Sequence, residues 1–278
     1  MITLKEAFIK ANERQIKYLD AIQNKPKHNI FRIASSLRAD HVSKFLYYYF
    51  EENNIVKAKQ SIYSGQKLLE FMNKLDNNKY FPIQLNKLFF LCSDSEEVTN
   101  NFKNFDIESI SNLDYRLEAG HTLGFVVQQI LKCDNEKALY YLNIYEDNYK
   151  NHSLKEYDVE ILKAIIDKDK DRIQELLKVY LLPKNHDKSP EKGMLSHGLL
   201  SYEATVFAKI AWIKGIEVKI DHPLLPMELL PIKPNENYLI EYDFLKPDYK
   251  PKEITNPQPE EKLGFFKRIF KKTNHNNI

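Results

Sequence analysis

Residues 199–234 read LLSYEATVFAKIAWIKGIEVKIDHPLLPMELLPIKP, and this stretch decides the fold. Its first half predicts a helix whose two ends are both marked. Ser201 can cap the N-terminus, and Glu203 places a negative charge in the first turn, where it suits the helix dipole. Gly215 can take the left-handed conformation that ends a helix. Because apolar residues occupy most faces between these ends, we expect the helix to be buried.

The second half of the stretch changes its period. Ile216, Val218 and Ile220 alternate with charged residues, which predicts a short extended or strand segment near 216–221. Prolines then exclude regular structure, and leucine and isoleucine side chains between them can hold the run against the core. These prolines are Pro223, Pro226, Pro231 and Pro234. We therefore expect a Pro-rich C-terminal run that crosses the surface.

The same stretch resembles a known family. Its spacing Ser-x-Glu-Ala-x-x-x-Ala-Lys-x-Ala-Trp-x-Lys-Gly-Ile-Glu-Val, followed by Asp-x-Pro-Leu-x-Pro-x-x-Leu-Leu-Pro, is similar to the C-terminal hallmark of the immunity protein 49 family. The likeness covers residues 199–245 and implies a bacterial protein that neutralises a polymorphic toxin. It is a packing pattern, so its residues are expected to be structural and none of them catalytic. The principal positions are Ser201, Glu203, Trp212, Gly215, Asp221, Pro223, Pro226 and Pro231.

Composition and periodicity favour an all-α fold built as an array of antiparallel αα-hairpins. The chain has 278 residues, of which only 7 are glycine, while 17 are tyrosine and 16 phenylalanine. A capping box at 3–6 opens a helix that can run to Asn24. Residues 135–148, 153–166 and 170–180 read as consecutive helices joined by short turns, which is typical of antiparallel hairpins.

Other segments give weaker signals. We expect a connector at 30–38, followed by a helix that Asp40 caps and that ends at Phe50. Residues 55–75 predict a helix interrupted by Gly65, and Pro82 can start a helix that runs to Cys92. Residues 115–132 predict one helix containing His121, which reads as a hydrogen-bonded core residue more readily than as a ligand.

The domain organisation follows from where the helical pattern stops. Residues 1–245 are expected to form one α-helical domain, with a subdivision near 93–111 as the alternative. Residues 246–261 read as a Pro-rich linker. Residues 262–272, KLGFFKRIFKK, predict a short basic amphipathic helix that contacts a membrane surface or a partner. Alternatively, this tail docks on its own domain or stays disordered. The contact residues would be Phe265, Phe266, Lys267, Arg268, Phe270 and Lys271.

The formal net charge of +2 hides an acidic middle. Residues 92–171 hold 9 Lys and Arg against 17 Asp and Glu. Such a surface favours a basic partner by charge complementarity, although solvated helix faces explain it equally well. The candidate partner-binding residues are Asp106, Glu108, Asp114, Glu118, Glu146, Asp147, Asp158 and Glu160.

Signals of catalysis, cofactors and targeting are weak throughout the sequence. It has no Gly-rich phosphate loop, no nucleophile elbow and no paired histidines at metal-ligand spacing, so we expect no cofactor and no metal. Nucleic-acid binding is not expected either, because the basic residues form no single stripe. We see no signal peptide and no run of ~20 apolar residues that could span a bilayer. With two cysteines far apart, a cytoplasmic protein is expected, with the tail as its one membrane contact.

Three hypotheses follow. The family resemblance favours an immunity protein that binds a cognate toxin and is not an enzyme. The alternative is a helical adaptor whose hairpins bind a peptide or protein partner, at the membrane surface if the tail holds it there. An enzyme would need a perturbed acid or base in a deep pocket, and Glu203 and His121 would be its first candidates. The sequence makes no prediction about oligomeric state.

Overall fold

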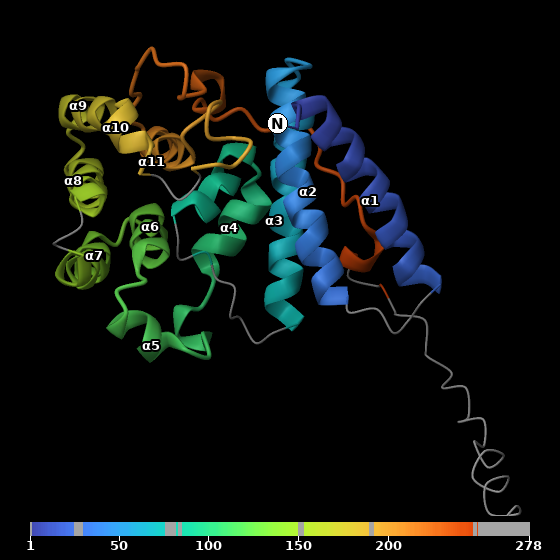
Figure 1. The fold of residues 1–278 in the computed structure, drawn as a ribbon. Coiled ribbons are helices and arrows are strands. Elements are labelled where there is room, and N and C mark those ends of the chain that lie inside the picture. Colours follow the sequence, from blue (N-terminus) through green and yellow to red (C-terminus); the bar gives the residue numbers. More distant parts are fainter. Residues whose placement is uncertain are drawn as a thin grey trace, which may run out of the picture.

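A computed structural model describes most of the chain, and the fold refers to the described residues. They are residues 2–24, 30–75, 82, 85–149, 153–188, 192–246 and 249. Within these ranges the fold is all-α, as predicted, and no strand is present. The helices form two groups that lie side by side, with α1–α3 on the right and α4–α11 on the left of Figure 1.

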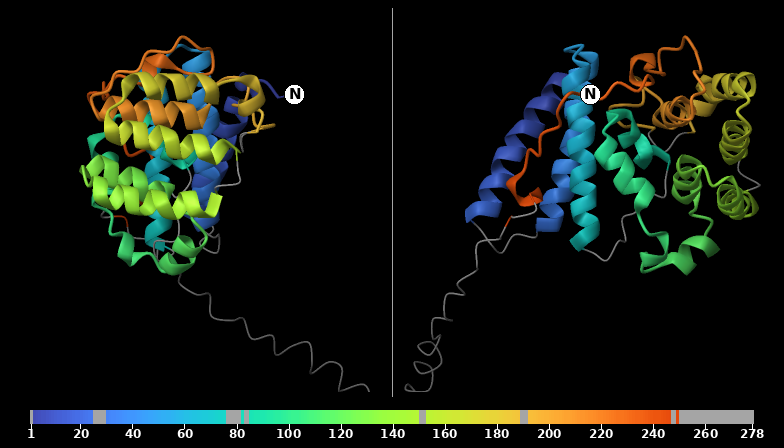
Figure 2. Two further views of the ribbon diagram at one scale, coloured as in Figure 1. Left: turned by 90° about the vertical axis from the view of Figure 1, so that its left-hand side faces the viewer. Right: turned by 180° about the vertical axis from the view of Figure 1, so that it is seen from behind.

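The first group consists of three long helices, α1 (Leu4–Asn24), α2 (Ile30–Phe50) and α3 (Ile55–Leu75). The predicted capping box begins α1. The Thr3 amide donates to Glu6 Oε2 at 2.8 Å, and the Glu6 amide donates to Thr3 Oγ1 at 3.2 Å. The three helices pack in sequence order, α1 on α2 and α2 on α3, as the right-hand view in Figure 2 shows.

Three predictions in this group are wrong. Residues 30–38 are not a connector, because α2 runs without a break from Ile30. Asp40 is therefore not a cap but a buried residue inside the helix, where Arg14 of α1 donates to it from Nε at 2.9 Å. Gly65 does not interrupt α3 either, and it faces His41 where α2 and α3 pack together.

The second group begins with short elements. They are the 3-10 helix η1 (Leu85–Ser93), α4 (Glu96–Asn104), η2 (Ile107–Ser109), α5 (Leu113–Glu118) and α6 (Leu123–Lys132). The helix predicted at 115–132 is broken between α5 and α6. Gly120 has φ +66°, and a Cβ there would lie 2.5 Å from Cβ of Asn148 on α7, so only glycine fits. His121 thus lies in the break, with its ring beside that of Tyr115.

The next helices confirm the predicted antiparallel hairpins. They are α7 (Asn135–Tyr149), α8 (Ser153–Asp167), α9 (Lys170–Tyr180) and the short α10 (Pro183–His186). In sequence order, α6 packs on α7, α7 on α8 and α8 on α9. Seen from the left, α7, α8 and α9 cross the molecule as successive layers (Figure 2).

Helix α11 (Tyr202–Ile213) is buried, as predicted. Every residue from Tyr202 to Ala211 is buried. The helix packs against η1, α6, α8 and α9, so it connects the hairpins to the segment that follows α3. Most of the apolar core belongs to one cluster that contains Phe207, Ile210 and the inner residues of those neighbours.

The chain after α11 returns to the first group without forming a strand. Ile216, Val218 and Ile220 are buried and Glu217 and Lys219 are exposed, so the alternation exists but no ladder pairs with it.

Residues 229–245, which we call the C-terminal strap, then run back along the α1–α3 group (Figure 2). The strap begins in η3 (Met227–Leu229) and ends with η4 (Asp243–Leu245). Tyr242 and Phe244 pack into a second core cluster with residues of α2 and α3.

Candidate functional site

The family-motif residues in and around α11 hold the helix in place. Ser201 Oγ accepts from the Ala204 amide at 3.3 Å, which is the predicted N-cap. Gly215 has φ +78°, the left-handed conformation expected at the C-terminus of the helix. Trp212 Nε1 donates to the Val218 carbonyl at 3.1 Å and ties the segment after Gly215 to the helix. These contacts are structural, in agreement with the motif's interpretation as a packing pattern.

A buried ion cluster joins α11 to the first helix group. Lys59 of α3 and Lys209 of α11 both contact the carboxylate of Asp94, and the Lys59 Nζ to Asp94 Oδ2 distance is 2.5 Å. Lys209 Nζ also donates to the carbonyls of Leu229 and Leu230, each at 2.9 Å. All three ionised side chains are almost completely removed from solvent. Together they fasten α3, α11 and the C-terminal strap at one point.

A second buried cluster pairs tyrosines with carboxylates. Tyr145 of α7 donates to Asp158 Oδ2 of α8 at 2.6 Å, and Tyr180 of α9 donates to Glu203 Oε2 of α11 at 2.7 Å. Burial and the nearby carboxylate charges raise the pKa of both phenols, so both remain hydrogen-bond donors. Glu203, the first candidate for an acid or base, thus connects α9 to α11.

The remaining motif residues lie along the exit from α11. Asp221 and Pro223 are exposed, Pro226 is buried, and Pro231 is half-buried beside the ion cluster, where its carbonyl accepts from Lys209 Nζ at 3.3 Å. The prolines therefore shape the path of the chain toward the strap.

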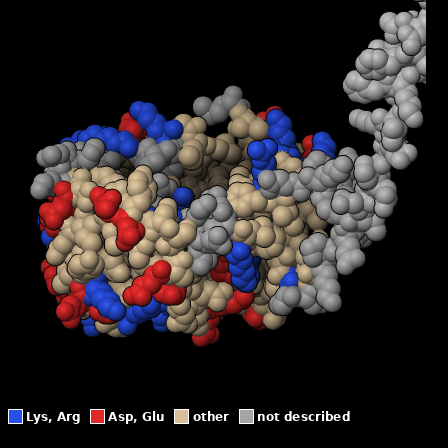
Figure 3. Space-filling model, turned by 90° about the horizontal axis from the view of Figure 1, so that it is seen from below, with Lys and Arg blue, Asp and Glu red and all other residues tan. Residues whose placement is uncertain are grey.

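The predicted acidic residues do not all lie on the surface. Asp106, Glu108, Asp114, Glu118 and Asp147 are exposed, and they come from η2, α5, α7 and the residue before η2. Seen from below, acidic side chains are spread over the part of the molecule that holds these elements, with lysines and arginines among them (Figure 3). These five residues are compatible with a partner-binding surface.

The other three candidates are engaged within the protein. Glu146 accepts from Lys163 at 2.9 Å and Glu160 from Arg172 at 3.4 Å, both at the surface. Asp158 is only 2% exposed and is bonded to Tyr145, so its prediction as a partner-binding residue is wrong. A buried carboxylate in this cluster cannot contact a partner surface.

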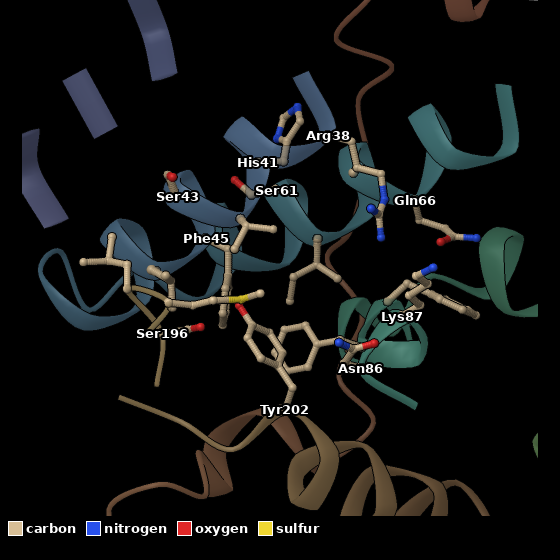
Figure 4. A pocket seen from close by; sticks show the side chains of 18 residues that line it. Arg38, His41, Ser43, Phe45, Ser61, Gln66, Asn86, Lys87, Ser196 and Tyr202 are labelled. Atoms are coloured by element: carbon tan, nitrogen blue, oxygen red, sulfur yellow. The ribbon is translucent and has the colours of Figure 1, made fainter. Parts of the chain in front are cut away.

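A cavity of about 330 Å³ lies between α2, α3, η1 and residues 194–202. Its walls are largely apolar, and its two cationic side chains lie on one side. Figure 4 shows the side chains of Arg38, Gln66 and Lys87 converging there, while Phe45 and Tyr202 lie farther along the cavity. Sequence reasoning missed this cavity because its lining comes from four separate segments.

Sequence reasoning also missed the roles of Lys59 and Asp94. A signal for Lys59 existed, because it shares a helix face with the buried residues Ile62 and Tyr63. No local pattern marks Asp94, which lies between η1 and α4 with φ +60°.

Three further predictions concern metal binding, membrane crossing and the C-terminal tail. Among the described residues, no three His, Cys, Asp or Glu side chains are grouped to hold a metal ion. None of the helices described is both long and apolar enough to cross a membrane. The predicted contact residues of the tail lie outside the described residues, as does most of the predicted linker. They are Phe265, Phe266, Lys267, Arg268, Phe270 and Lys271.

Comparison with known families finds one match, over part of the chain. Residues 126–229, which run from α6 through α11 to η3, match the family model of immunity protein 49. This match confirms the resemblance seen in the sequence. The match begins well before the predicted stretch at 199–245 and ends inside it. No curated protein and no solved structure matches the chain.

Proposed function

We propose that this protein binds a cognate bacterial toxin and neutralises it by forming a stoichiometric complex. The family match carries this proposal, because it covers the hairpin helices and α11 together. Immunity proteins act as binding proteins, and a rigid helical array is suited to presenting a fixed surface.

We propose that the protein acts by binding the toxin and not by catalysis. Three buried carboxylates are engaged in structural contacts. Asp94 is bonded to two lysines, and Glu203 and Asp158 are bonded to tyrosines. Such groups lie inside the protein, where a toxin or its substrate cannot reach them.

The exposed acidic residues of η2, α5 and α7 are the proposed toxin-binding surface. Negative charge there would accelerate association with a basic toxin surface and favour the correct partner. Asp114 and Glu118 are exposed on α5, so reversing their charges leaves the core contacts intact. We place this action in the cytoplasm, where the free cysteines Cys92 and Cys133 would stay reduced.

The test is co-expression with the product of the adjacent gene. We expect the pair to co-purify as a one-to-one complex and the immunity protein to restore growth. A harmless or unbound neighbour would overturn the proposal and favour the adaptor hypothesis.

The surface is tested separately. We expect Asp114→Lys and Glu118→Lys together to slow association at least tenfold at low salt, with a smaller effect at high salt. Glu13→Lys, on exposed α1, is the matched control. An association rate that does not depend on salt, or an equal effect of the control, would argue against this surface even if the complex forms.

A further inference from the structure

We propose that the cavity between α2, α3 and η1 binds a small amphipathic anion, namely a carboxylate carried on a medium-chain aliphatic or an aryl body. Two features of the cavity support this. Its walls are largely apolar, and two cationic side chains that have no partner among the described residues converge at one side of it (Figure 4).

The apolar part is formed by buried side chains from three segments. Phe45 and Leu46 come from α2, Ile62 from α3, and Phe89 and Phe90 from η1. The volume of about 330 Å³ lies in the range of small-molecule sites, which extends from about 300 to 1,000 Å³. An alkyl chain or an aromatic ring would therefore find both space and apolar contact.

Two exposed apolar residues also line the cavity. Val42 is 44% exposed and Met194 is 57% exposed. They give a ligand an apolar path from solvent to the inner walls.

The cationic side of the cavity holds two half-buried cations, Arg38 and Lys87. Within the described residues, neither Arg38 nor Lys87 makes a hydrogen bond or an ion pair. Two other half-buried lysines do have partners, Lys67 with Glu70 at 3.0 Å and Lys163 with Glu146 at 2.9 Å. A charge removed from water without a partner is unfavourable, so this side of the cavity is suited to an anion.

Electrostatics supports the same conclusion. Burial lowers the pKa of Lys87, and the positive charges of Arg38 and Arg116 lower it further. Burial alone lowers the pKa of Arg38. A bound carboxylate would relieve this repulsion and accept hydrogen bonds from both cations, while the amides of Gln66 and Asn86 lie beside it (Figure 4).

The experiment is calorimetric titration of the full chain with octanoate. Octanol, which has the same chain without the charge, and acetate, which has the charge without the chain, are the matched probes. We expect octanoate to bind with a one-to-one stoichiometry and at least tenfold more tightly than either probe. Equal binding of octanoate and octanol, or no binding of octanoate, would overturn the proposal.

Variants locate the site. We expect Arg38→Gln and Lys87→Gln each to weaken octanoate binding at least tenfold, while Lys10→Gln, on the exposed face of α1, leaves it unchanged. Thermal denaturation identifies variants that fail to fold. If Arg38→Gln fails to fold, the binding of octanoate to Lys87→Gln decides the test.

Unchanged binding in Lys87→Gln would overturn the proposal. The proposal would also be overturned if wild type does not bind octanoate and Lys87→Gln weakens a toxin complex. The cavity would then receive a side chain of the partner. This test needs no toxin, so it can fail or succeed independently of the proposed function.

Discussion

Replacing Asp94 with asparagine should strongly destabilise this protein, because two buried lysines depend on that one carboxylate. In the wild type, Lys59 and Lys209 both contact Asp94, and the three side chains carry a net charge of one. Asp94→Asn keeps the shape of the side chain and raises that buried charge to two. The backbone carbonyls around Lys209 remain, but carbonyl dipoles do not neutralise a second cation.

The magnitude follows from the geometry. At 2.5 Å, the Lys59–Asp94 attraction is about 7 kcal/mol at an effective dielectric constant of about 20. Desolvation of the ions offsets much of this, and removing one partner of a buried pair costs about 3–5 kcal/mol. Each kcal/mol lowers the Tm of a chain near this size by about 2–4 °C, so we expect a decrease of about 6–20 °C.

The assay is urea denaturation at pH 7, followed by far-ultraviolet circular dichroism and by the fluorescence of the single tryptophan, Trp212. Asp114→Asn, at an exposed position, is the control and should stay within about 0.5 kcal/mol of wild type. Adding Lys59→Met to Asp94→Asn returns the cluster to its original net charge and should recover about 1 kcal/mol or more. If Asp94→Asn costs less than about 1 kcal/mol, or the second substitution gives no recovery, the electrostatic reasoning is refuted.

Three further predictions concern other sites. Gly120→Ala should destabilise by about 1–3 kcal/mol more than Gly193→Ala in urea denaturation, because both have positive φ but only Gly120 abuts another helix. Burial lowers the pKa of His41 to about 3, so the unfolded chain binds a proton that the native protein excludes. Lowering the pH from 7 to 4.5 should therefore reduce the free energy of unfolding by about 2–3 kcal/mol through His41. Urea denaturation of His41→Gln at both pH values should lack this contribution. Cys133 is exposed, and a hydrogen bond from Lys214 lowers its pKa, so iodoacetamide should alkylate it faster in wild type than in Lys214→Gln at pH 7.5. Equal rates in the two proteins would contradict this.

The sequence predicted the elements whose signals are local. Helix α11 was found because its cap and its terminal glycine lie within fifteen residues of each other, at Ser201 and Gly215. The hairpins from α7 to α9 were found for the same reason. Asp40 shows the limit of such signals. It resembles a cap when only its neighbours are read, but its partner Arg14 lies on another helix, 26 residues away.

The sites depended on contacts that no local pattern contains. Lys59 and Asp94 are 35 residues apart, and the cavity collects Arg38 and Lys87 from different helices. Asp158 was different, because its burial could have been predicted. It lies four residues before Leu162 and seven before Ile165, which puts it on the buried face of α8. The prediction that Asp158 binds a partner instead followed from the many acidic residues in 92–171.

The path of the strap has a consequence for how the protein is made. Gln60 of α3 exchanges two hydrogen bonds with the backbone of Leu239, 179 residues later, and His41 of α2 meets the hydroxyl of Tyr242 at 2.7 Å. The helices synthesised first therefore lack part of their packing until almost the whole described chain has left the ribosome. Folding cannot finish segment by segment during translation. A nascent chain that stops short of the strap would expose the apolar faces of α2 and α3 and become a target for chaperones and proteases.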